Sequence, residues 1–307
     1  MGPAAASATA PALDSDPGLE ATLLSYSDLK YRDAFWPNRK YEDSCDRLAL
    51  RAFLPPTGDR LIEVGAGFGR LADEYAGYRE VVLLDASQTL LQAARERLGD
   101  EPRFTIIAGD AYRLPFPDAS FDAAVCVRVM QHFEDPRAVI RELSRVVRPG
   151  GVLVLEAANK RNLKAILAYL LHRQRWSPFS SGSQPYEDIF LVPYRGRGVL
   201  SRPSAARVPA TTAASWWTAS TTFLHAPRDV RAWLNAAGFK IEGTRSVGLF
   251  RLPFLTSNLP ARMLVGLERL QQPSLAHLTP GPSIFVKAVR LQDSSVARVD
   301  RIRGGED

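Results

Sequence analysis

The chain has 307 residues, a hydrophobic fraction of 46% and a net charge of +6. These values are typical of one large globular domain or two small ones, and the basic excess favours anionic partners without identifying any. Two cysteines without metal-type spacing exclude a disulfide scaffold and predict no metal site, which indicates a cytoplasmic location.

Both ends of the chain are predicted to lie outside the folded domain. Residues 1–20 are rich in Ala, Pro and Ser and lack the basic start and apolar core of a signal peptide, so we expect a disordered tail. The charged stretch 292–307 is expected to be a flexible tail. No uninterrupted run of about 18 apolar residues occurs, so no transmembrane helix is predicted.

A helix at 40–54, which stops at Pro55, leads into alternating strands and helices. The predicted strands are 60–64, 80–85, 103–110, 121–127, 151–157, 240–248 and 283–290, the last with the alternation of a sheet edge. The predicted helices are 70–77, 87–99 with Ser87 as N-cap, 135–151 closing on a Pro-Gly-Gly turn, and 227–239. Strands this apolar, separated by helices, predict an α/β fold with a doubly wound, mostly parallel seven-stranded sheet.

The loop after the first strand reads GAGFG, with Gly65, Gly67 and Gly69. Glycines in a strand-to-helix turn let a ligand approach the backbone where a Cβ atom would clash. The dinucleotide pattern G-x-G-x-x-G requires a glycine at position 70, which is Arg70 here. Glu63, just ahead of the loop, would repel a pyrophosphate but suits a ligand that carries an ammonium group.

Two further acids lie at the ends of the next two strands. Asp85 stands twenty positions after Gly65, where a carboxylate can accept both hydroxyls of a ribose. Asp110 ends the third strand, where it can meet an adenine amino group. Together with Glu63, these acids predict a crevice for an adenosine with a cationic, amino-acid-like tail and no phosphate.

Four stretches, EVGAGFG (63–69), VVLLDAS (81–87), GDAYRLPFPDASFDAAVC (109–126) and RELSRVVRPGG (141–151), resemble class I S-adenosylmethionine-dependent methyltransferases. The similarity is closest to the small-molecule group that includes ubiquinone and menaquinone biosynthesis methyltransferases. It implies a Rossmann-like methyltransferase domain at 21–291, a cofactor half at 55–157, and an antiparallel seventh strand at 283–290. The implied cofactor is S-adenosyl-L-methionine. The implied cofactor residues are Glu63, Gly65, Ala66, Gly67 and Gly69 at the methionine part, Asp85 and Ala86 at the ribose and adenine, Asp110 and Ala111 at the adenine edge, and Val127 and Arg128 near the sulfur.

Residues 158–222 interrupt the alternation and are predicted to form an inserted lid, which would shape the acceptor pocket together with 31–41. The stretch LKAILAYLLHRQRW within it is apolar with basic ends. It fits a lid helix, a grip on an anionic substrate, or peripheral contact with a membrane. The expected acceptor is therefore a small molecule or a lipid-like one, and the oligomeric state is open.

His132 is the only histidine near the expected crevice, where it is a candidate catalytic base; a packing role is the alternative. The predicted function is methyl transfer. An NAD-dependent oxidoreductase is the first alternative, and Arg70 and Glu63 argue against it. An RNA or other nucleic-acid methyltransferase is the second, and it is disfavoured because the chain lacks a dense strip of basic and aromatic residues. A protein that binds the cofactor without catalysis also fits the sequence.

Overall fold

The computed structural model describes residues 29, 31–37, 39–171, 176–185 and 223–292. The predicted N-terminal tail lies outside these residues, as does the C-terminal tail beyond residue 292. Residues 172–175 and 186–222 of the predicted lid also lie outside them. The domain boundaries drawn from the sequence therefore stay predictions.

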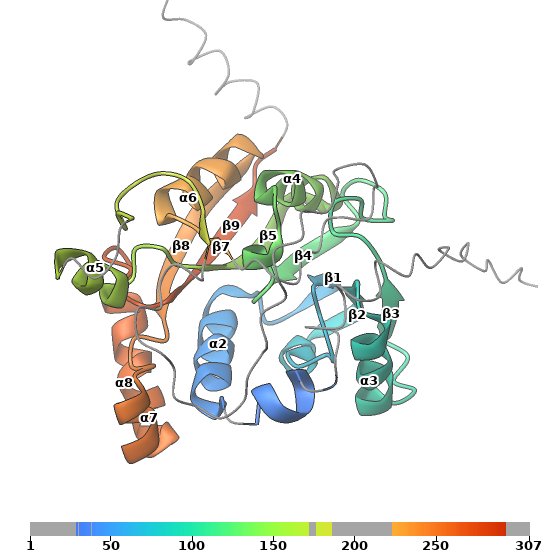
Figure 1. Ribbon diagram of the computed structural model, residues 1–307. Coiled ribbons are helices and arrows are strands. Elements are labelled where there is room, and N and C mark those ends of the chain that lie inside the picture. Colours follow the sequence, from blue (N-terminus) through green and yellow to red (C-terminus); the bar gives the residue numbers. More distant parts are fainter. Residues whose placement is uncertain (1–28, 30, 38, 172–175, 186–222, 293–307) are drawn as a thin grey trace, which may run out of the picture.

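A seven-stranded sheet forms the centre of the molecule (Figure 1). Its strand order is β3-β2-β1-β4-β5-β9-β8. Strands β1 to β5 run parallel, whereas β9 is antiparallel to both β5 and β8, so β8 points the same way as β1 to β5. The fold class predicted from the sequence is confirmed. The strands are β1 (Gly58–Val64), β2 (Tyr78–Asp85), β3 (Phe104–Ala108), β4 (Phe121–Cys126), β5 (Val147–Ala158), β8 (Phe239–Val247) and β9 (Ser283–Arg290).

Helices cover both faces of this sheet (Figure 1). On one face, α4 (Pro136–Val146) and α6 (Pro227–Ala236) share a buried cluster with Ile62 of β1. On the other, α2 (Lys40–Phe53) and α8 (Ala261–Ser274) share a second cluster with Leu61, beside α3 (Gln88–Leu98). Neighbouring strand residues point to opposite faces, so covering both faces explains why the strands are apolar throughout.

Local signals place several helix ends where the sequence predicts them. The Ser87 hydroxyl accepts a hydrogen bond from the Leu90 amide at 3.2 Å and caps α3. That helix ends at Gly99, with φ of +63°. Asp135 caps α4 in the same way, by accepting from the Arg137 amide at 3.1 Å. The cap at Ser87 and the stop at Gly99 are local, which is why the sequence alone predicts them.

Three predictions are wrong in detail. The helix expected at 70–77 is only the single turn η2 (Ala72–Tyr75), because β2 already begins at Tyr78 and leaves no room for more. The Pro149-Gly150-Gly151 run is not a turn before the fifth strand but a bulge within β5, where the pairing shifts from Phe121↔Val147 to Ala123↔Val152. The strand at 283–290 is not at the edge: β9 lies between β5 and β8, and β8 is the edge strand.

The structure also contains a helical hairpin between β8 and β9 that was not predicted from the sequence. It consists of α7 (Pro253–Asn258) and α8, and α8 packs against α2 and β8. The buried positions of α8 include Glu268, Gln271 and Gln272, so its core-facing stripe lacks the apolar periodicity that identifies a helix. Within the predicted lid, the structure describes α5 (Leu163–Leu170) and one strand of a small hairpin, β6 (Gln184–Pro185), which pairs with β7 (Phe223–Leu224).

Candidate functional site

The glycine loop that follows β1 has an unusual backbone. Gly65, Gly67 and Gly69 have φ angles of +79°, +54° and +71°, a region that L side chains rarely adopt. A Cβ atom at Gly65 would also lie 2.1 Å from a methyl carbon of Val129. The amides of Gly65 and Ala66, the latter buried, donate to the Leu84 carbonyl at 2.7 and 3.1 Å and bind the loop to the end of β2. The loop therefore presents bare backbone at the carboxyl edge of the sheet.

Glu63 lies at the end of β1, directly before this loop, and is 3% exposed. Its Oε2 atom has no hydrogen-bond partner among the described residues. Burial raises the pKa of this carboxyl to about 8, and the neighbouring Tyr75 hydroxyl and the Arg70 guanidinium oppose that rise. A buried acceptor without a donor is costly, and a ligand ammonium would supply both the hydrogen bond and the counter-charge.

Asp85, at the end of β2, is buried and holds the glycine loop from the neighbouring strand. Its Oδ2 accepts from the Gly67 amide and its Oδ1 from the Ser87 amide, both at 2.8 Å. Burial raises the pKa of the carboxyl, and these amides counteract the rise. The Ala86 amide is a third donor to this carboxylate. A carboxylate offers about four acceptor positions, so about one remains for a ribose hydroxyl. Ala86, beside it, is half-buried.

Asp110 follows β3 and is half-buried. Its Oδ1 accepts from the Tyr112 amide at 2.8 Å, and burial raises the pKa of the carboxyl. Ala111, next to it, is buried. Strands β3, β2 and β1 are adjacent and parallel, so their carboxyl ends lie side by side. Glu63, Asp85 and Asp110 therefore lie at the same carboxyl edge of the sheet. The structure thus brings the three predicted acids to adjacent strand ends.

Arg128 follows β4, and its side chain is directed at buried acids. Its guanidinium binds both carboxylate oxygens of Asp46 in α2, at 2.8 and 3.1 Å, and its amide donates to Glu156 Oε2 in β5 at 2.9 Å. Asp46 and Glu156 are fully buried, and together they raise the pKa of Arg128, whereas burial opposes the rise. Val127, which precedes it, is buried. The observed contacts of Arg128 join β4 to α2 and β5, so a position near the cofactor sulfur stays a prediction.

The sequence reasoning missed a cluster that surrounds the loop. Arg70 donates to Asp46 Oδ2 at 3.1 Å, and its guanidinium carbon lies 3.8 Å from the centroid of the Trp36 ring. The Tyr31 ring makes an edge contact with Phe68 of the loop. Segment 31–36 therefore packs over the glycine loop, and its part in an acceptor pocket stays a prediction. The signal in the sequence was Arg70 itself, which departs from the dinucleotide pattern, whereas nothing distinguished Asp46 from other polar helix residues.

His132, in the short helix η3 (Met130–His132), is 5% exposed. Burial lowers its pKa to about 4, so the ring is neutral at pH 7 and can accept a proton only as a weak base. A second histidine, His225, follows β7 and is fully buried. Its Nε2 lies 3.1 Å from the Met130 carbonyl oxygen, and its Nδ1 lies 2.9 Å from Ser183 Oγ. A catalytic role for His132 stays a prediction.

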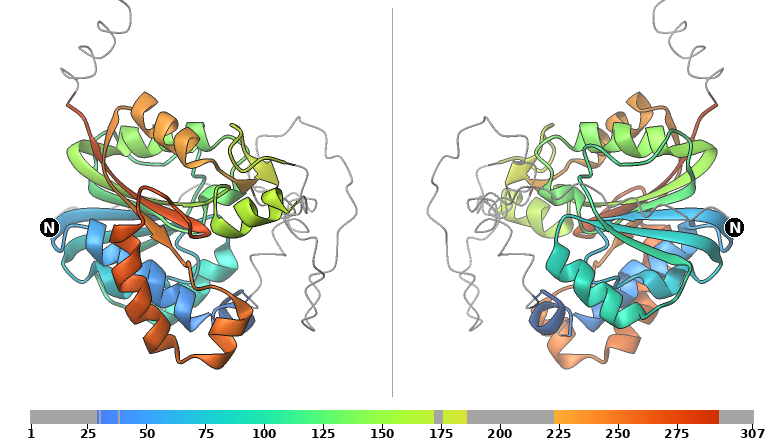
Figure 2. Two further views of the ribbon diagram at one scale, coloured as in Figure 1. Left: turned by 90° about the vertical axis from the view of Figure 1, so that its left-hand side faces the viewer. Right: turned by 90° about the vertical axis from the view of Figure 1, so that its right-hand side faces the viewer.

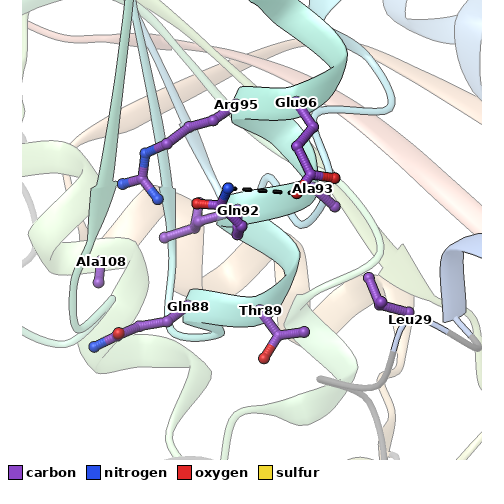
Figure 3. A pocket seen from close by; sticks show the side chains of 9 residues that line it. Leu29, Gln88, Thr89, Gln92, Ala93, Arg95, Glu96 and Ala108 are labelled. Carbon is purple, nitrogen blue, oxygen red and sulfur yellow. Dashed lines mark hydrogen bonds between the residues drawn. The ribbon is translucent and has the colours of Figure 1, made fainter.

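A cavity of about 650 Å³ runs along the outer side of α3 (Figure 3). Gln88, Thr89, Gln92 and Arg95 line it from the helix, and Ala108 lines it from the end of β3. None of the predicted cofactor residues lines this cavity. Within the described part of the chain, no three metal-ligating side chains come together.

Comparisons with known proteins agree with this geometry. Residues 62–155 match the family model described as "Methyltransferase domain". The demethylmenaquinone methyltransferase of Renibacterium salmoninarum is 37% identical over 110 residues, which is 36% of this chain and 45% of that protein. The ubiquinone biosynthesis O-methyltransferase of Thiobacillus denitrificans is 30% identical over 157 residues, covering 48% of this chain and 66% of that protein.

The matched region is thus only a part of each relative, and the chain spans about half the length of the curated relatives it matches. Among solved structures, the S-adenosylmethionine-dependent methyltransferase from Mesorhizobium loti superposes with a TM-score of 0.50 at 21% identity. That match covers 79% of this chain and 96% of the other. At this level of identity the likeness concerns the fold.

Proposed function

We propose, from the premise that residues 62–155 form a class I methyltransferase domain, that this protein transfers a methyl group from S-adenosyl-L-methionine to a small-molecule or lipid-like acceptor. One observation carries the proposal. The buried Glu63 carboxyl, whose Oε2 atom has no hydrogen-bond partner among the described residues, adjoins a loop of positive-φ glycines, and Asp85 stands on the next strand. That combination suits a ligand with an ammonium group and a ribose better than a phosphorylated one.

The residues at the strand ends fit this cofactor, which supplies a methyl group on a sulfonium when bound. Glu63 would accept from the ammonium group, and the bare backbone at Gly65 and Gly67 would let the methionine chain lie close. Asp85 would use its remaining acceptor capacity for the ribose, and Asp110 would meet the adenine edge. Each role rests on an atom that is unpartnered or has acceptor capacity left.

The protein's own contribution to the reaction is to position the reactants and keep water out. Methyl transfer from a good leaving group needs little further chemical assistance when donor and acceptor are held in line. The packed segment 31–36 and the described start of the lid would bound the acceptor pocket. His132 is the candidate to accept a proton from the acceptor's nucleophilic atom, as a weak base because burial lowers its pKa to about 4. The expected compartment is the cytoplasm, which agrees with free thiols at Cys45 and Cys126.

Calorimetry with S-adenosylhomocysteine and, separately, with NADH tests the cofactor assignment. We expect S-adenosylhomocysteine to bind and NADH not to bind. Asp85→Asn should weaken S-adenosylhomocysteine about 10- to 100-fold, since it weakens hydrogen bonds made by a charged acceptor. Asp100→Asn, at an exposed carboxylate, is the matched control and should bind as the wild type does. Binding of NADH alone would support the oxidoreductase instead.

The acceptor can be sought with methyl-labelled cofactor and a cell extract, followed by mass spectrometry of labelled products. Labelled small molecules or lipids support the proposal. Label confined to RNA would support the nucleic-acid alternative. Tight binding of S-adenosylhomocysteine without any labelled product would indicate a binding protein rather than an enzyme.

A further inference from the structure

Exposed apolar side chains gather on one part of the molecule. Of the fourteen large hydrophobic residues that are exposed among the described ones, twelve fall in the ranges 163–179 and 252–278. Phe254, at 75%, is the most exposed of them. Single exposed apolar residues are ordinary on a protein surface, but a concentration of this size marks a site of interaction.

Helix α8 is amphipathic, but an apolar stripe faces outward and polar side chains face the core. Met263, Leu267 and Leu270 lie at helical spacing and are 51%, 40% and 69% exposed. The opposite side of the helix buries Glu268 and Gln272, which hydrogen-bond to Tyr41 Oη and the Cys45 carbonyl. A helix that buries polar side chains and exposes leucines presents its apolar stripe outward, where an apolar environment can cover it.

Helix α5 carries a matching stripe, in which Leu163, Leu167 and Leu170 are 45%, 49% and 61% exposed. The start of α5 is held against the loop that follows α8. The Leu163 amide donates to the Pro280 carbonyl at 2.8 Å, and the buried Asn159 amide group donates to the Thr279 carbonyl at 2.7 Å. The start of α5 therefore lies beside the loop that follows α8, and we call the two helices with their leucine stripes the α5/α8 face.

The α5/α8 face adjoins the edge of the sheet that carries the candidate site. Helix α5 follows β5 and α7 follows β8, and these strands end on the same edge as β1 to β4. The left view of Figure 2 looks at this side of the molecule, with α5, α7 and α8 turned to the viewer. A partner that binds the α5/α8 face would therefore lie near the candidate site.

The charges around the α5/α8 face are of one sign. Arg161, Lys164, Arg262 and Arg269 are exposed. The ranges 159–171 and 249–279 contain a single acid, Glu268, and it is buried. We propose that the α5/α8 face docks on a lipid bilayer that contains anionic headgroups, with the two leucine stripes in the interfacial region and the basic residues at the phosphates. Among the described helices, none is long and apolar enough to cross a bilayer.

Flotation of the full chain with vesicles tests this docking. One vesicle set is phosphatidylcholine alone and the other is an equal mixture of phosphatidylcholine and phosphatidylglycerol. We expect binding to the anionic set, weakened by high salt. Arg262→Gln with Arg269→Gln should reduce the affinity about 30-fold, at about fivefold per charge. Leu167→Ser with Leu270→Ser should reduce it at least about tenfold, because less apolar area enters the interface.

Matched controls separate a specific face from general attraction of a basic protein to anionic lipid. Arg79→Gln with Arg141→Gln removes the same charge from two side chains elsewhere that are 69% and 70% exposed, and should leave vesicle binding unchanged. Equal loss in this control, or wild-type binding by the α5/α8 variants, would overturn the proposal. Light scattering tests whether a second copy of the chain covers this face instead. Membrane docking is refuted if the wild type forms a dimer that the leucine variants dissociate and does not bind vesicles.

Discussion

The buried carboxyl of Glu63 should make the stability of the ligand-free protein depend on pH, and Glu63→Gln should remove that dependence. Burial raises the pKa of this group from its ordinary value of 4.5 to about 8. Between these two values the folded protein binds the proton more tightly than the unfolded chain does. The stabilisation is therefore complete below pH 4.5 and is lost as the pH rises through 8.

The size of this effect follows from the two pKa values. Each tenfold change in proton affinity is worth about 1.4 kcal/mol, so the rise from 4.5 to about 8 corresponds to about 5 kcal/mol between acidic and alkaline pH. That is a large part of the 5–15 kcal/mol that is typical of a domain. Glu63→Gln carries no charge at any of these pH values, so its free energy of unfolding should not show this decline.

Urea denaturation of the wild type and Glu63→Gln between pH 5 and pH 9 measures the difference. We expect the variant to become progressively more stable than the wild type as the pH rises. Glu134→Gln, at an exposed carboxylate, is the control and should follow the wild type. A constant difference between wild type and Glu63→Gln across the range would refute the reasoning, because it would mean that Glu63 is already ionised when folded.

Three further predictions concern stability and are read from urea denaturation. Gly65→Ala should lower the free energy of unfolding by about 3 kcal/mol or more, because the added Cβ clashes with Val129 at a residue with positive φ. Gly99→Ala, with φ of +63° and no atom within 4 Å, should lower it by only about 1 kcal/mol. Equal losses would show that the clash does not matter. Asp46→Asn should cost about 3–5 kcal/mol, because it removes the fully buried charge that pairs with the half-buried Arg128. A loss below about 1 kcal/mol would contradict that role. His225→Gln should reduce the loss of stability below pH 6.5, since burial lowers the pKa of His225 to about 4 and the stabilisation disappears as the pH falls through that value; identical acid sensitivity of variant and wild type would count against it.

The sequence was most informative where the signal is local. The glycine loop, the cap at Ser87 and the stop at Gly99 depend on backbone conformation and on hydrogen bonds within a few residues, and all are found where predicted. The acids at 63, 85 and 110 were placed on one edge because parallel strands end together. Periodicity failed for α8, whose buried stripe is polar.

The strand order at the far side of the sheet could not be read from local pattern. The alternation in 283–290 suggested an edge, yet β9 pairs with β5 and β8 on its two sides. Alternation reports how a strand is covered on its faces, whereas edge position depends on which other strands are present to pair with it. The same holds for the Pro149-Gly150-Gly151 run, which becomes a bulge because β5 already begins to pair at Val147.

The sequence alone determined the parallel sheet, the bare glycine loop and the set of acids at its edge, since each follows from residue type and spacing along the chain. Only the tertiary structure decided the electrostatics of those groups. Glu63 gains its raised pKa from burial, and Arg128 is directed to Asp46, which lies 82 positions away in the chain. Burial and long-range ion pairing depend on what packs around a side chain, and no local pattern records that.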